Sequence, residues 1–309
     1  MKFIRSVPMT MGGLSLALAA LGNLLLSLPY GEMLRYICGV LSLGILAIFA
    51  LKIVLDWPHA REELKTPVPL SVLPTATMTI MLLSVYARPY IGILAVGIWY
   101  AAIIVHVGIM LLFFKRFVLN FKLDAVFPSW FIVGVGIAAA SVTAPAMGAV
   151  VIGQAAFYVG LTLYFAIFLL VVLRMNKVKI FPEPARPTIA IFTAPMSLLI
   201  AGYFSSFAFQ GQATILIYIM LAIAAASYIY VTCMMFSLLK IKFYPTYAAF
   251  TFPYVISAAA FRLGADFIAN RHGLDFLVTI ADAAMWIAIA VVIFVLVHYI
   301  RFFRFWLKF

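Results

Sequence analysis

The chain has 309 residues, of which 67% are apolar and only 10% are charged. Its mean hydropathy of +1.19 excludes a water-soluble globule, whose apolar share is nearer one half, and indicates an integral membrane protein. The formal net charge of +12 would suggest a nucleic-acid partner in a soluble protein. Here the basic residues lie in short runs between apolar spans, as they do in cytoplasmic loops. We therefore expect no nucleic-acid partner.

Ten apolar segments are long enough, at about 17 to 25 residues, to cross a bilayer as helices. In chain order they cover residues 8–28, 33–55, 69–87, 89–114, 128–145, 149–173, 187–207, 212–238, 245–264 and 276–299. The first segment has a basic start like that of a secretory signal. Because it also carries the repeat described below, we expect it to remain as a helix. We predict an all-α integral membrane fold, with residues 1–309 forming a single transmembrane channel domain.

The basic residues also predict the orientation of the chain. With both termini in the cytoplasm, only four of the 21 Lys and Arg residues lie outside, namely Arg35, Arg88, Arg262 and Arg271. The positive-inside rule favours this arrangement. We expect a multi-pass protein of the inner, cytoplasmic membrane with the N- and C-termini in the cytoplasm.

A repeat organises the ten spans into five helical hairpins. A proline opens each odd-numbered span at a near-constant spacing, at Pro8, Pro69, Pro128, Pro187 and Pro245. One such proline is ordinary in the first turn of a helix, but five at regular intervals indicate repeats that start near 8, 69, 128, 187 and 245. A second break follows within each odd span, at Gly12 and Gly13, Pro74, Gly134 and Gly136, Pro195, and Pro253. Five hairpins predict a quasi-five-fold arrangement.

The breaks indicate which helices lie inside. A broken membrane helix is tolerated where its freed backbone groups are covered by protein or face water. Serine and threonine concentrate in the odd spans, partly because hydroxyls bond to such groups and to neighbouring helices. We therefore predict odd helices that line a central pore and even helices outside them. The predicted lining residues are Thr10, Gly12, Gly13, Pro74, Thr75, Gly134, Gly136, Phe192, Thr193, Pro195, Thr251 and Pro253.

One lining position differs between two otherwise similar repeats. FTFP at residues 250–253 matches FTAP at 192–195, so Phe252 stands where the other repeat has Ala194. A phenyl ring beside a helix break can close a narrow path by steric block and dewetting. The alternative is a phenylalanine packed between helices, in a chain that has 28 of them. Phe252 is the candidate gate.

Ionisable side chains within the spans are few. Arg262 and Asp266 are four residues apart on one helix face and form either a structural pair or an outer-vestibule site. We expect Asp282 to make an interhelical or subunit contact, although a proton-coupled transporter requires a carboxylate of this kind. A path without a ring of charged side chains should bind ions weakly, which suits rapid conduction better than high-affinity binding. Basic residues at the inner mouth favour anions.

Enzyme chemistry finds no support in the sequence. The four histidines lie scattered over loops and helices, without the spacing of a metal site such as HExxH. Phosphate-binding loops and nucleophile motifs are also missing from the sequence. We expect no enzyme activity, no cofactor and no metal.

Two short motifs carry a resemblance to a known family. PMTMGGLSLALAALGN at residues 8–23 and FTFP at 250–253 resemble the tellurite-resistance/dicarboxylate transporter family, which holds bacterial TehA, the yeast malate permease and the plant guard-cell slow-type anion channels. The likeness covers essentially the whole chain, as a bacterial TehA-like homologue of the plant channels. It implies a homotrimer in membrane lipid, one pore per subunit, chloride or nitrate as the permeant anion, and Phe252 as the gate.

A second function remains open from the sequence. Other members of the family that the chain resembles carry larger anions. The alternative is therefore a proton-coupled transporter or exporter of C4-dicarboxylate, sulfite or tellurite-related anions, for which Asp282 is the candidate carboxylate.

Overall fold

The computed structural model describes residues 2–178, 181–207 and 214–306, and this part of the chain is helical without a strand. It contains ten helical stretches that are long and apolar enough to cross a membrane, which confirms the predicted fold class. These are Met9–Ser27, Gly31–Leu55, Pro67–Ile91, Ile93–Val118, Trp130–Met147, Val150–Lys177, Glu183–Ser206, Thr214–Leu238, Pro245–His272 and Phe276–Arg304. Residues 212 and 213, predicted to begin the eighth span, lie outside the described residues.

The largest difference from the predicted boundaries is at the end of the ninth span. The prediction ended this span at residue 264, but its helix continues to His272. The polar residues that suggested an end lie on the helix surface and pair there, as Arg262 does with Asp266. An ion pair one turn apart stabilises a helix instead of ending it.

Every odd-numbered span changes helical geometry near the predicted break. The first consists of η1 (Met9–Met11), α2 (Gly12–Leu24) and η2 (Leu25–Ser27), and the third of α5 (Pro67–Val72) and α6 (Pro74–Ile91). The fifth consists of α8 (Trp130–Val135) and α9 (Ala138–Met147), the seventh of η5 (Glu183–Thr193) and α11 (Ala194–Ser206), and the ninth of η6 (Pro245–Phe250) and α13 (Thr251–His272). Pro74, Pro195 and Pro253 each fall in the first turn of the new α-helix, where a missing amide donor breaks no helical bond.

The even-numbered spans, in contrast, are α-helices without an internal break. They are α3 (Gly31–Leu55), α7 (Ile93–Phe113, which a π-helical turn extends to Val118), α10 (Val150–Lys177), α12 (Thr214–Leu238) and α14 (Phe276–Trp306). Each packs against the odd helix that precedes it in the chain, which forms the five hairpins.

The five odd helices form a closed ring. Helix α2 packs against α6, α6 against α9, α9 against α11, α11 against α13, and α13 returns to α2. Each span contains an apolar stretch of 18 residues. In the odd spans 61% to 83% of that stretch is buried, against 22% to 33% in the even spans. The odd helices therefore lie inside and the even helices outside, as predicted.

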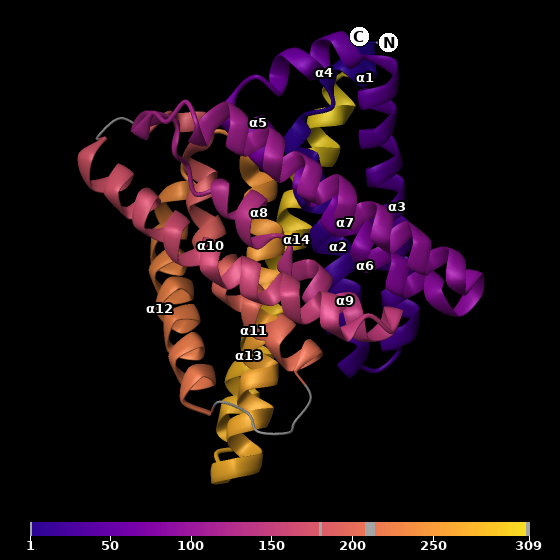
Figure 1. Cartoon of the computed structure of the whole chain (residues 1–309), viewed down its shortest axis with the longest axis vertical. Helices are drawn as coiled ribbons and strands as arrows, with labels where there is room; N and C mark the ends of the chain where they lie inside the picture. Colours follow the sequence, from indigo (N-terminus) through magenta and orange to yellow (C-terminus); the bar gives the residue numbers. More distant parts are fainter. Residues whose placement is uncertain (1, 179–180, 208–213, 307–309) are drawn as a thin grey trace.

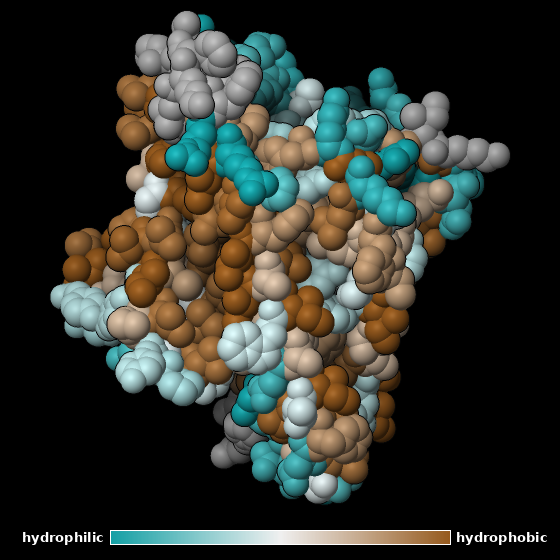
Figure 2. Space-filling view, turned by 180° about the vertical axis from the view of Figure 1, so that it is seen from behind, coloured by the Kyte–Doolittle hydropathy of each residue, from teal (hydrophilic) through white to brown (hydrophobic). Residues whose placement is uncertain are grey.

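The surface and the chain ends fit a membrane-spanning body. Short helix α1 (Lys2–Ser6) contacts α14, and both chain ends lie at the same end of the molecule (Figure 1). Apolar side chains gather across the middle of the face shown in Figure 2, and hydrophilic ones lie toward its two ends. An apolar band between polar ends is what a bilayer requires.

Two glycines at the breaks let the inner helices approach closely. A Cβ atom on Gly12 would collide with the Thr75 hydroxyl of the neighbouring span. A Cβ atom on Gly136 would collide with the Ile132 carbonyl and lie 2.8 Å from the Met78 sulfur. Small residues of this kind allow backbones to pack tightly in membranes, where lipid supplies no hydrophobic driving force between helices.

We expect Gly136→Ala to destabilise the fold by about 1–3 kcal/mol, because the added methyl overfills a packed contact. The measurement is thermal unfolding of the detergent-purified protein. Gly108→Ala on α7 is the matched control, since a Cβ there meets no atom within 4 Å and alanine favours a helix. Equal loss of stability in the two variants would contradict the packing role of Gly136.

Candidate functional site: two cavities on the ring axis

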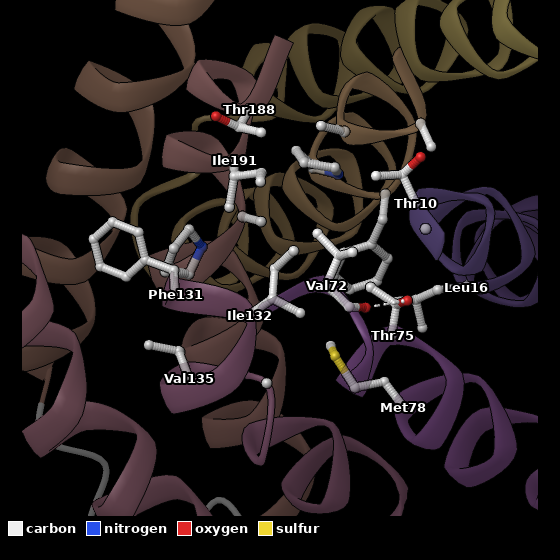
Figure 3. A pocket seen from close by; sticks show the side chains of 18 of the residues that line it. Thr10, Leu16, Val72, Thr75, Met78, Phe131, Ile132, Val135, Thr188 and Ile191 are labelled. Carbon is white, nitrogen blue, oxygen red and sulfur yellow. Dashed lines mark hydrogen bonds between the residues drawn. The ribbon is translucent and has the colours of Figure 1, made fainter. Parts of the chain in front are cut away.

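An inner cavity lies on the axis of the ring, and all five odd spans supply its wall (Figure 3). Its lining includes Thr10 and Gly13, Thr75 and Met78, Phe131 and Gly136, Thr188 and Pro195, and Phe252 and Pro253. The cavity measures about 50 Å³, which is room for about three or four water molecules. The described wall holds four threonines and no ionisable side chain. It is narrow, uncharged and mostly apolar.

An outer cavity lies beyond the inner one along the same helices. Its volume is about 360 Å³, and the five odd spans and α14 line it. The wall is more polar than that of the inner cavity. It carries Asn23, Ser27, Ser205, Arg262 and Asp282.

Phe252 and Leu198 are the two described residues that line both cavities. Phe252 is 8% exposed and Leu198 is 4% exposed. Phe252 comes from the first turn of α13 and Leu198 from α11, two helices that are neighbours in the ring. These two apolar side chains therefore form the boundary between the inner and outer cavities.

Six of the predicted lining residues lie at the wall of the inner cavity: Thr10, Gly13, Thr75, Gly136, Pro195 and Pro253. The other six predicted lining residues lie away from the walls of both cavities: Gly12, Pro74, Gly134, Phe192, Thr193 and Thr251. A helix in a ring presents only part of its circumference to the axis. Residues next to a break therefore face the neighbouring helices as often as they face the cavity.

The contacts of these six residues explain their positions. Gly12 faces Thr75, and Gly134 faces Ile167 and Leu163 on outer helix α10. Phe192 packs edge-on against Phe131, with ring centroids 5.8 Å apart. Pro74 is buried in the first turn of α6.

Thr193 and Thr251 donate hydrogen bonds to backbone carbonyls at the helix breaks and do not line the cavity. Both are fully buried, and each stands six residues after the opening proline of its repeat, as Thr75 does. The Thr251 hydroxyl donates to the Ala248 carbonyl at 2.7 Å, the Thr193 hydroxyl to Ala190 at 3.2 Å, and the Thr75 hydroxyl to Val72 at 2.7 Å. The three bonds are equivalent, and each satisfies a carbonyl at the end of the segment before the break.

The helix ends give the inner cavity a polarity that its side chains lack. Helices α2, α6, α9, α11 and α13 all begin beside the cavity. The amino end of an α-helix carries a partial positive charge that favours anions. The opposing carbonyls of the preceding segments accept threonine hydrogen bonds in three of the five spans. The inner cavity can therefore favour an anion without an ionised side chain.

Two residues of the outer cavity wall, Arg262 and Asp282, belong to an ion-pair cluster that also includes Asp266. Arg262 Nε lies 3.2 Å from Asp266 Oδ1, as the sequence spacing predicted, and Arg262 Nη1 lies 2.7 Å from Asp282 Oδ1 on α14. The contact made by Asp282 is therefore interhelical. The three side chains are 37%, 47% and 42% exposed, so water reaches them.

Sequence reasoning missed two residues near the cavities. Leu198 is one of many leucines, and no motif marks it. His106 on outer helix α7 is fully buried, and its Nδ1 lies 2.8 Å from the Thr77 hydroxyl. Its ring lies near Gly136, which has no side chain to separate them.

The comparisons with known proteins point to one family. The profile of the SLAC1 family, described as voltage-dependent anion channel, matches residues 4–300. This match covers almost the whole chain and includes residues of all ten spans. No curated protein matches the chain significantly.

We expect Thr251→Val to destabilise the protein by about 1–2 kcal/mol. The substitution puts a methyl group of similar shape in place of a buried hydroxyl, so the hydrogen bond to the Ala248 carbonyl at the break is lost. Thr162→Val on α10 is the control, because that hydroxyl also donates within its own helix, to Tyr158 at 2.9 Å, but is exposed. Thermal unfolding in detergent measures both changes. A loss as large in the control would assign the effect to hydroxyl removal in general.

Proposed function

Because the chain belongs to the SLAC1 family of voltage-dependent anion channels, we propose that it is an anion-selective channel that conducts small monovalent anions, such as chloride and nitrate, along the axis of each subunit. Members of this family are channels and transporters, which is also consistent with a protein that is not an enzyme. In this proposal the inner and outer cavities are two parts of one path.

The position of Phe252 carries the proposal. The ring of Phe252 and the side chain of Leu198 separate two cavities that share one axis. An apolar constriction excludes water, and an ion without its water cannot cross it. We propose that Phe252 is the gate and that Leu198 is the side chain against which it closes.

The sign of the permeant ion rests on the helix ends and on the basic residues. Five helix amino ends beside an uncharged cavity favour an anion over a cation. The cavity offers no ring of charge that would hold the anion tightly, and weak holding suits a channel.

We also propose the setting in which this path operates. The chain would be a TehA-like homotrimer in the inner membrane, with both termini in the cytoplasm. The location of α1 beside α14 supports termini on one side, and the positive-inside rule makes that side cytoplasmic.

A second candidate function is a proton-coupled transporter or exporter of C4-dicarboxylate, sulfite or tellurite-related anions. The observation that favours it is Asp282, an ionisable carboxylate on the wall of the outer cavity. Membrane carboxylates in such places often carry protons. A transporter would show saturable, pH-driven uptake, whereas a channel would show ohmic current.

We predict that Phe252→Ala raises anion conductance at least about tenfold, which corresponds to lowering a barrier by about 1.4 kcal/mol. The measurement is electrophysiology of the purified protein in planar bilayers, with chloride, nitrate and gluconate exchanged on one side. Conductance should rise for chloride and nitrate, and the reversal potential should follow the anion gradient. An unchanged current in a well-folded variant would refute the gate.

Leu198→Ala should also raise conductance, by less than Phe252→Ala does, because it widens the same constriction from the opposite side. Leu16→Ala is the matched control, since Leu16 is equally apolar and buried but lines only the inner cavity. Equal conductance gains at positions 198 and 16 would show that any cavity-enlarging change opens the path, which would argue against a constriction at Leu198.

A further inference from the structure

The outer cavity contains one cation and one anion in direct contact. Among its described lining residues, Arg262 and Asp282 are the ionisable ones. Arg262 Nη1 lies 2.7 Å from Asp282 Oδ1, within the range of a charge-assisted hydrogen bond. Both side chains are more than one third exposed, so the pair lies open to the cavity.

The guanidinium of Arg262 has two carboxylate partners on different sides. Its Nε is 3.2 Å from both oxygens of Asp266, one turn along the same helix. Its Nη1 reaches across to α14. Asp266 is not on the cavity wall, whereas Asp282 is. Of the two carboxylates that contact the guanidinium, Asp282 is therefore the one that shares the cavity wall with it.

Neutral polar groups complete the surroundings. Asn23 and Ser27 from the first span and Ser205 from α11 line the same cavity. A guanidinium presents five donors in a planar fork that matches oxoanions. Amide and hydroxyl groups add donors to an anion held by that fork. The chemistry suits a small anion such as nitrate or chloride.

We propose that Arg262 is an anion-binding residue of the outer cavity and that Asp282 competes with the anion for the guanidinium. This inference rests on the proposed anion path and places a recognition site within it. The Asp282 carboxylate takes a hydrogen bond from Arg262 Nη1 and places a negative charge beside the guanidinium, so it opposes a second anion there.

Competition for one cation makes anion binding depend on the charge at position 282. Helix α13 contributes Arg262 and Asp266 to this cluster, and the first span contributes the uncharged Asn23 and Ser27 to the same cavity wall. Removal of the carboxylate charge at position 282 should therefore raise the affinity of Arg262 for an anion.

The experiment measures binding, so it does not depend on conduction. Thermal unfolding of the full-length protein in detergent is followed against sodium nitrate, with sodium gluconate at equal ionic strength as the reference. A ligand that binds only the folded state raises the melting temperature. The unmodified protein should show a nitrate-specific rise, and Asp282→Asn should tighten the apparent nitrate affinity about fivefold or more, a coupling of ordinary size.

Four variants distinguish competition between Asp282 and an anion for Arg262 from a purely structural ion pair between Arg262 and Asp282. Asp282→Asn should bind nitrate more tightly than the unmodified protein. Asp266→Asn, which changes the net charge equally but lies off the cavity wall, should tighten nitrate binding less. Arg262→Gln should lose the nitrate-specific shift, and Arg262→Lys, which keeps the charge and tests for misfolding, should bind weakly.

Several outcomes would overturn the site. A nitrate shift that survives Arg262→Gln would place the anion elsewhere, and a shift no larger than that of gluconate would mean that no site exists. Equal tightening in Asp282→Asn and Asp266→Asn would reduce the effect to net charge. Nitrate binding that responds to these variants as expected, but no anion current in bilayers, would support this site while contradicting the proposed channel.

Discussion

The structure depends on how a membrane protein satisfies backbone groups at a helix break. In lipid, a carbonyl without a partner costs several kcal/mol, so a broken helix must be surrounded by protein. The breaks lie in the odd spans, which form a closed ring covered by unbroken helices. Inside the ring, the hydroxyls of Thr75, Thr193 and Thr251 donate hydrogen bonds to equivalent backbone carbonyls. The constraint that forces the odd helices inward also creates the axis on which both cavities lie.

The breaks also place the two side chains that separate the cavities. Pro253 makes α13 begin at Thr251 and places Phe252 in its first turn. The equivalent turn of α11 starts at Ala194, and Leu198 follows one turn later. Two similar helices thus meet at the axis with side chains of different size at different heights. The repeated odd helices form the wall, and two side chains that differ between the repeats form the boundary between the cavities.

Much of the fold could be predicted from the sequence because it follows from composition and spacing. The ten spans are set by apolar length, and the odd and even classes are set by the prolines, glycines and hydroxyls. Gly136 and Pro195, two of the predicted pore-lining residues, lie at the wall of the inner cavity. Thr193 and Thr251 lie off that wall, because a hydroxyl that lines a cavity and one that bonds a backbone look alike in sequence. Leu198 and the partner of Asp282 depend on the rotation of each helix about its own axis, which no local pattern records.

The closure of the ring has a consequence for biosynthesis. The hydroxyl of Thr251 reaches the carbonyl of Gly13 at 3.3 Å, across 238 residues of chain, where the last inner helix meets the first. A nascent chain with four hairpins in the membrane therefore has an open seam and an unfinished wall. The ninth span supplies the missing wall and Phe252 together. The wall of the two cavities and the side chain that lies between them are therefore completed in one step.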